Sequence, residues 1–124
     1  MKFKTLMIIK AIVCLSIGIP ILFFPEFFYS LFGYKLNGVI FPAQEYGASL
    51  IGNLFLAWIG RNAEFSIGRT AITWALFIYD AIGFVITLIL ALSGQANALI
   101  WGPVILYLGL ALGFGYFLLK PTTP

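Results

Sequence analysis

An acidic residue stands in the middle of a long apolar run, where the sequence reads LFIYDAIGF over residues 76–84. Counted from Ala71, where the run begins, Asp80 lies about 14 Å along a helix. An aspartate at the centre of a bilayer costs roughly 2.5–3.5 kcal/mol, so such residues usually face the protein interior and have a partner. Asp80 is therefore expected to point inward and either to make a structural hydrogen bond or to bind a proton.

Two residues are candidate partners for Asp80. Asn53 lies at a similar depth, reached from the opposite side of the membrane, so its amide can meet the carboxylate across neighbouring helices. Lys10 approaches from the same side as Asp80 and lies about 6 Å shallower. Its long side chain either reaches Asp80 or extends to the membrane interface, and the second alternative is the favoured interpretation.

A set of polar residues continues from this position towards the opposite surface. Glu45, Ser49 and Asn53 share one helical face at spacings of four residues. Together with Asp80 they either form a track for protons, ions or a small ligand, or an interhelical hydrogen-bond network that fixes the helix register. The network is the favoured interpretation. Glu45 also suits the first turn of a helix, or, together with Gln44 and Tyr46, the polar mouth of a cavity between helices.

The composition excludes several other kinds of site. The chain has 62% hydrophobic and 9% charged residues, whereas soluble domains carry about 25% charged residues. Histidine is absent and Cys14 is the single cysteine, so we expect no metal site, no haem ligation by histidine, no internal disulfide and no cofactor. Basic residues form no stripe that would bind a nucleic acid. The class is therefore an integral membrane protein without catalytic residues that the sequence can identify.

The elements that must position these residues are four apolar segments, each close to the ~20 residues that cross a bilayer. Backbone groups in lipid must be paired within their own segment, so all four are predicted to be helices. Lys10 interrupts the first segment and no cleavage site follows, so we expect this segment to be retained. The sequence thus predicts an all-α, integral membrane four-helix bundle in one transmembrane domain, 1–124, with helices at 5–24, 42–60, 71–92 and 98–119.

A fifth, shorter helix is predicted between the first two. Pro25 suits the first position of a helix, Glu26 suits the first turn, and Gly33 suits its end. The aromatic residues between them favour a helix over residues 25–33 that lies in the membrane interface. The alternative is an extended loop whose phenylalanines plug the end of the bundle.

The positions of the basic residues predict the orientation in the membrane. Lysine and arginine are concentrated at the two chain ends and in the 61–70 loop, whereas Lys35 alone lies on the opposite side. Cytoplasmic loops carry an excess of these residues, so the N-terminus, the C-terminus and the 61–70 loop are predicted to be cytoplasmic.

Small residues recur at helix-packing spacings. They allow close approach of helices in lipid, and they either hold the four helices together, which we favour, or form a homo-oligomer. The pairs are Gly109 with Gly113 and Ala48 with Gly52; Gly83 lies beside Asp80, and Ala11, Cys14 and Gly18 share one face of the first helix.

Four stretches carry a resemblance to small, uncharacterised prokaryotic four-helix membrane proteins of the DoxX-like type: PEFFYSLFG, FPAQEYGASLIGNLFLAWIGR, TWALFIYDAIGF and ANALIWGPVILYLGLALGFGYFLL. This resemblance implies a four-helix bundle in a prokaryotic inner (plasma) membrane, and it implies no catalytic residues. The chain is also similar in length and helix number to small multidrug resistance transporters. That family has a membrane-embedded glutamate in its first helix, where this chain has Lys10, so the similarity is of architecture only.

Three functions are compatible with these features. A non-enzymatic accessory or structural subunit of a membrane complex is favoured, with membrane lipids, a homo-oligomer or a larger complex as partners and no nucleic acid. The alternative is a small proton-coupled transporter that uses Asp80 and works as an oligomer. An enzyme acting on a lipid or quinone through Asp80 or Glu45 comes last, because no nucleophile–base pair is visible.

Overall fold

The computed structural model describes all residues from Met1 to Pro124, and the fold is all-α, as the sequence predicts. The long helices lie on the predicted segments, although α4 begins earlier than expected because the Ser66 hydroxyl accepts a hydrogen bond from the Arg69 backbone N–H, 3.1 Å away. The elements in chain order are α1 (Phe3–Phe23), α2 (Pro25–Ser30), α3 (Phe41–Gly60), α4 (Ile67–Ser93), the 3-10 helix η1 (Ala98–Ile100) and α5 (Trp101–Leu119).

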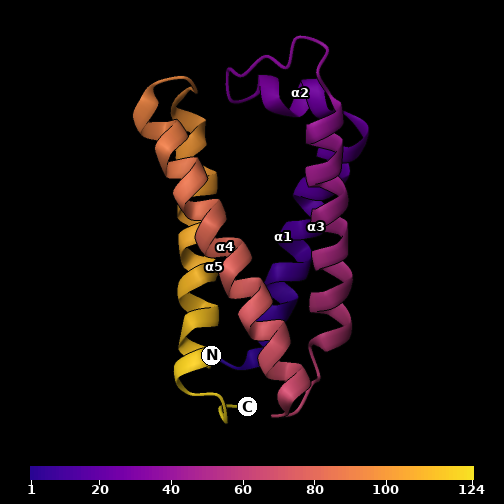
Figure 1. The fold of residues 1–124 in the computed structure, drawn as a ribbon, viewed down its shortest axis with the longest axis vertical. Helices are drawn as coiled ribbons and strands as arrows, with labels where there is room; N and C mark the ends of the chain where they lie inside the picture. Colours follow the sequence, from indigo (N-terminus) through magenta and orange to yellow (C-terminus); the bar gives the residue numbers. More distant parts are fainter.

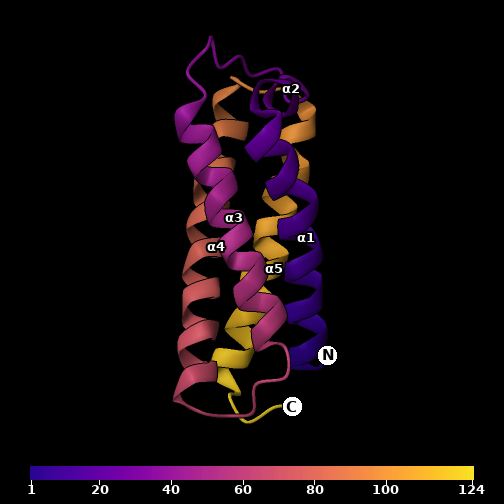
Figure 2. The ribbon, with the colours of Figure 1, turned by 90° about the vertical axis from the view of Figure 1, so that its right-hand side faces the viewer.

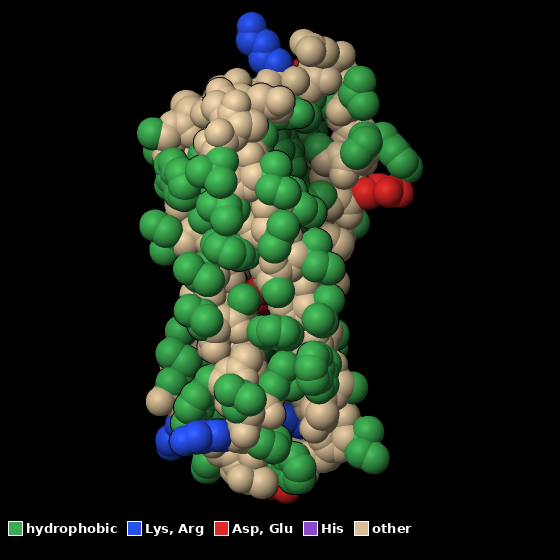
Figure 3. All heavy atoms as spheres, turned by 60° about the vertical axis from the view of Figure 1, so that its left-hand side comes forward, with side chains coloured by type: hydrophobic (Ala, Val, Ile, Leu, Met, Phe, Trp, Pro, Cys, Tyr) green, Lys and Arg blue, Asp and Glu red, His purple; other side chains and the backbone are tan.

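The long helices differ in their suitability for a membrane. By length and composition, α1, α4 and the segment Ala98–Leu119 are apolar enough to cross a bilayer. The 20-residue helix α3 is not among these three, because Gln44, Glu45 and Asn53 lower its mean hydropathy. On the face drawn in Figure 3, hydrophobic side chains cover the sides of the helices, while lysine and arginine side chains lie near the two ends of the molecule. These features suggest a membrane location.

The long helices form two antiparallel pairs. Helix α1 packs along α3, and α4 packs along α5 (Figure 1). Both termini and the α3–α4 connection lie at one end of the molecule, whereas α2 and the α4–α5 connection lie at the other (Figures 1 and 2). The backbone N–H of Phe3 donates to the carbonyl of Pro124 over 2.8 Å, which ties the two ends of the chain together.

The two helix pairs are joined by a hydrophobic core at the end that carries the termini. This core takes residues from α1, α3, α4 and α5, whereas the buried residues of the smaller cluster nearer α2 come from α1 and α3. The pairs therefore diverge towards the α2 end, as Figure 1 shows. The buried residues of the joining core are Phe3, Leu6, Met7, Ala11, Ala57, Leu76, Leu110, Phe114 and Phe117.

Within the first pair, contact depends on Gly47 and Gly18. A Cβ atom added to Gly47 would lie 2.9 Å from the backbone nitrogen of Leu22, so only glycine fits there. The prediction that Ala48 and Gly52 pack inside the protein is wrong: Ala48 is exposed, and no atom lies within 4 Å of a Cβ added to Gly52. Adjacent helical residues point about 100° apart, so the contact face contains Gly47 and the next residue turns away from it.

Of the three glycines that were predicted to pack between the other helices, two lie in close contacts and one does not. A Cβ on Gly83 would lie 2.5 Å from the ring of Tyr107, and a Cβ on Gly113 would lie 2.9 Å from Leu6, so both glycines allow close contacts inside the protein. Gly109 has nothing within 4 Å of such a Cβ atom, and the prediction that it packs inside is wrong. Ala11, Cys14 and Gly18, which were predicted to share one face of α1, are all buried.

Candidate functional site

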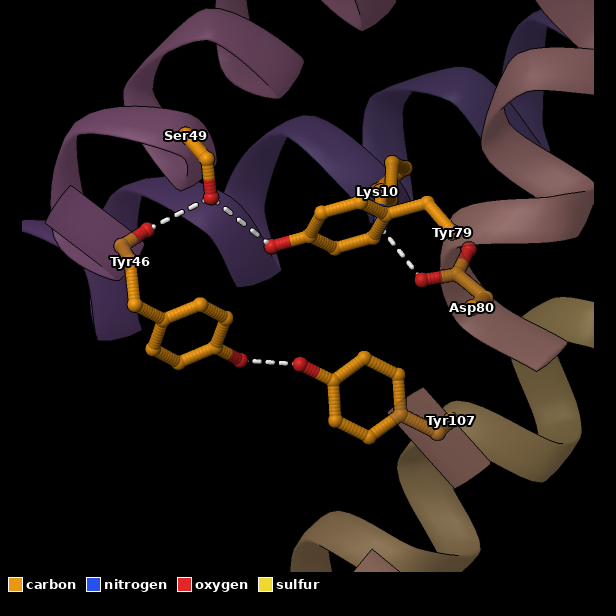
Figure 4. Close-up of polar contacts among 6 residues, drawn as sticks. All are labelled: Lys10, Tyr46, Ser49, Tyr79, Asp80 and Tyr107. Carbon is orange, nitrogen blue, oxygen red and sulfur yellow. Dashed lines mark hydrogen bonds and ion pairs between the residues drawn. The ribbon is translucent and has the colours of Figure 1, made fainter. Parts of the chain in front are cut away.

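A buried ion pair joins the two helix pairs. The Nζ atom of Lys10 in α1 donates to Oδ1 of Asp80 in α4 over 2.6 Å, and the two residues are 1% and 0% exposed (Figure 4). Asp80 points inward, as predicted. The interpretation that Lys10 extends to the interface is wrong, because Lys10 lies on the buried face of α1 with Met7 and Cys14 and finds a counter-charge there.

The protein does not fill the hydrogen-bonding capacity of this ion pair. Oδ2 of Asp80 is buried and has no hydrogen-bond partner. The ammonium group of Lys10 has three N–H donors, and its single hydrogen bond goes to Asp80. The Tyr79 ring lies 4.8 Å from Nζ and contributes a cation–π contact. Two N–H donors of Lys10 and Oδ2 of Asp80 thus have no hydrogen-bond partner within the protein.

Tyrosine hydroxyls bridge the helices beside the ion pair. The hydroxyls of Tyr46 in α3 and Tyr107 in α5 are hydrogen-bonded to each other. Ser49 donates to the carbonyl of Tyr46 over 2.7 Å and lies 3.1 Å from the hydroxyl of Tyr79 (Figure 4). Sequence reasoning missed Tyr79 and Tyr107 as site residues. The available signal was a hydroxyl group in the middle of an apolar run, far from the interface where tyrosine is usually found.

The remaining predicted residues do not reach the ion pair. Asn53 is half-buried and its side chain makes no hydrogen bond, so it is not the partner of Asp80. Glu45 is exposed and makes no ion pair or hydrogen bond. Ser49 alone connects to the site, through Tyr79. The predicted track from Glu45 to Asp80 is therefore not continuous, because neither Glu45 nor Asn53 makes a hydrogen bond to another residue of the track.

A cavity of about 720 Å³ lies between the diverging helix pairs, and we call it the interhelix cavity. Of its 26 lining residues, 19 are hydrophobic, and Lys10 is the only charged one. The four hydroxyl-bearing residues of Figure 4 also line it: Tyr46, Ser49, Tyr79 and Tyr107. Asp80 lies behind Lys10 and does not line the cavity. Cavities of this size, mostly apolar with a few polar groups, are typical small-molecule sites.

The interhelix cavity is open along the side of α4. Ile82, Ile86 and Ile89 line it, and each is more than half exposed on the surface of the helix. Because α4 is one of the helices suited to cross a membrane, this opening faces the region that lipid would occupy.

At its far end the cavity is closed by α2 and the residues after it. Phe28 and Tyr29 line this end, and burial raises the pKa of the Tyr29 phenol, which keeps its hydroxyl protonated. Asn97, beyond α4, donates from its backbone N–H to the carbonyl of Phe32 over 2.8 Å and from its side chain to that of Leu31 over 2.9 Å. These bonds connect the first helix pair to the second across the end of the cavity.

The tyrosine bridge predicts a measurable pattern of stability. Tyr46→Phe leaves the Tyr107 hydroxyl without its partner, so the free energy of unfolding in detergent should fall by about 1 kcal/mol. The double variant Tyr46→Phe, Tyr107→Phe removes both hydroxyls and should lose less than the two single losses added together. Tyr116→Phe is the matched control on the exposed side of α5 and should change stability by less than about 0.5 kcal/mol. Strictly additive losses would contradict the bridge.

No cluster of three or more cysteine or acidic side chains that could hold a metal ion is present. Comparison of this chain with protein-family models, with curated proteins and with solved structures found no match. The DoxX-like resemblance stays a prediction, and a function has to be argued from the site itself.

Proposed function

We propose that this protein is a four-helix membrane bundle that binds an apolar small molecule, taken from the bilayer, in the interhelix cavity. The observation that carries this proposal is the composition of the cavity wall: 19 hydrophobic residues and a single charged one, Lys10. A cavity that opens towards lipid along α4 suits a ligand that is dissolved in the membrane.

The proposal includes the membrane arrangement. Helix α3 crosses the bilayer as the fourth span, supported by its 20-residue length and its packing along α1. Helix α2 lies in the outer interface, where its exposed aromatic residue Phe27 suits the headgroup region. The termini and residues 61–66 are cytoplasmic on the charge pattern, in a prokaryotic inner membrane.

Ligand binding of this kind is compatible with a non-enzymatic accessory subunit, the role that the sequence favours. The proton-coupled transporter stays a second prediction. Two observations count against Asp80 as its proton site: the carboxylate is held by Lys10, and it does not line the cavity. Proton exchange at Asp80 would require the ion pair to separate first.

A bulky side chain in the cavity tests the proposal. Val13 lines the cavity and its neighbour Ile12 is 58% exposed on the outer side of α1, so Val13→Trp and Ile12→Trp form a matched pair. Small molecules that co-purify with the protein in mild detergent are extracted and quantified by mass spectrometry. We expect Val13→Trp to reduce the amount of bound apolar compound several-fold, while Ile12→Trp retains the wild-type amount.

The outcome depends on both variants being folded, which circular dichroism and size-exclusion chromatography establish. Ile17→Trp, one turn further along the cavity wall, replaces Val13→Trp if that variant is unstable. Equal amounts of bound compound in the wild type, Ile12→Trp and the cavity variants would reject the proposed function.

A further inference from the structure

The unfilled hydrogen bonds of the ion pair specify one end of the ligand. Lys10 lines the interhelix cavity, and two of its three N–H donors have no acceptor in the protein. A buried donor without a partner costs free energy, and hydrogen bonds to a charged group are among the stronger ones. A ligand that places an oxygen acceptor near Nζ would recover this loss, so the cavity favours a molecule with an acceptor at its inner end.

The charges around this point specify the charge of the ligand. Lys10 and Asp80 sum to zero, and no other charged side chain lines the cavity. An anionic headgroup would leave one net negative charge in a low-dielectric interior, and a cationic headgroup would be repelled by Lys10. A neutral acceptor such as an ester carbonyl or a hydroxyl satisfies Lys10 without adding a charge.

The rest of the cavity specifies the body of the ligand. From Lys10 towards α2 the wall is mainly aliphatic and aromatic, and the lateral opening along α4 gives access from lipid. From these features we infer that the ligand is an electrically neutral amphiphile whose carbonyl or hydroxyl oxygen accepts a hydrogen bond from Lys10. This inference rests on the proposed function and adds the chemical class of the ligand.

Four probes that share the same hydrocarbon chain length show how the charge and the acceptor of the headgroup affect binding. Methyl palmitate has a neutral acceptor, palmitate is an anion, palmitylamine is a cation, and hexadecane has no acceptor. Their binding to the wild-type protein in nanodiscs is compared by native mass spectrometry. We expect methyl palmitate to bind about tenfold more tightly than hexadecane, the gain of one charge-assisted hydrogen bond. It should also bind more tightly than palmitate and palmitylamine, which bring a net charge into the cavity. Tightest binding of palmitate or palmitylamine would overturn the inference.

The role of Lys10 is tested with the double variant Lys10→Met, Asp80→Leu, which removes the donors without leaving an isolated charge. We expect its affinity for methyl palmitate to fall about tenfold, to that of hexadecane. Unchanged affinity would overturn the inference. A second readout needs no variant: the carbonyl stretch of isotope-labelled methyl palmitate should shift to lower frequency on binding to the wild type, and an unshifted band contradicts the hydrogen bond.

The same probes distinguish a failure of the headgroup assignment from a failure of the proposed function. If all four bind equally well and Val13→Trp abolishes their binding, the cavity binds apolar molecules and only the headgroup assignment fails. If none of the four binds, or if Val13→Trp leaves their binding unchanged, the proposed function fails as well.

Discussion

Replacing Asp80 by leucine, with Lys10 left in place, is expected to lower the free energy of unfolding by about 3–5 kcal/mol. Lys10 is 1% exposed, so the change leaves a buried ammonium group without its counter-charge. The pair also supplies the hydrogen bond that joins α1 to α4. Steric trapping or titration with a denaturing detergent measures the effect on the purified protein.

Three further variants assign this loss to the ion pair. Lys10→Met, Asp80→Leu replaces both charges by apolar groups and should recover most of the lost stability, because a buried pair is often no more stable than well-packed apolar residues. Asp80→Asn keeps one oxygen acceptor and should lose less than Asp80→Leu. Glu45→Leu removes an exposed acid and should change stability by less than about 0.5 kcal/mol. If Asp80→Leu costs no more than Glu45→Leu, the ion pair does not hold the helices together.

Most of the fold could be predicted because long apolar segments have few possible structures. Three of the four long helices correspond to apolar runs of the length that crosses a bilayer, where irregular backbone would be excluded. The early start of α4 depends on a cap at Ser66, which apolar patterning does not detect. The end of α2 at Ser30 likewise precedes Gly33, because the chain turns before it reaches the glycine.

The site was predictable in part. Counting residues predicted the depth of Asp80, and the free-energy cost of a carboxylate at that depth predicted its inward direction. Depth alone, however, ranked Asn53 above Lys10 as its partner. The face of α1 was the better guide, since Lys10 lies four residues before Cys14 on the same buried stripe. The tyrosine bridge and the cavity were not predictable, because both depend on how far the two helix pairs diverge in space.

The second large effect on stability is expected at the close contact between α1 and α3. Gly47→Leu is expected to lower the free energy of unfolding by about 3 kcal/mol, at the upper end of the usual cost of overpacking. The added Cβ would lie 2.9 Å from the backbone nitrogen of Leu22 and 3.2 Å from the carbonyl oxygen of Gly18, and backbone atoms cannot rotate away as a side chain can. The α1–α3 pair must therefore separate, and its loss of stability is measured by steric trapping.

Gly52→Leu is the matched control, with the same substitution on the same helix. A Cβ at Gly52 meets nothing within 4 Å, so leucine there should leave stability unchanged or raise it by up to about 1 kcal/mol, the helix-propensity difference between leucine and glycine. The small-residue pattern in the sequence places Gly52, with Ala48, in the contact instead. A larger loss for Gly52→Leu than for Gly47→Leu would therefore contradict the helix register of the structure and restore the face predicted from the sequence.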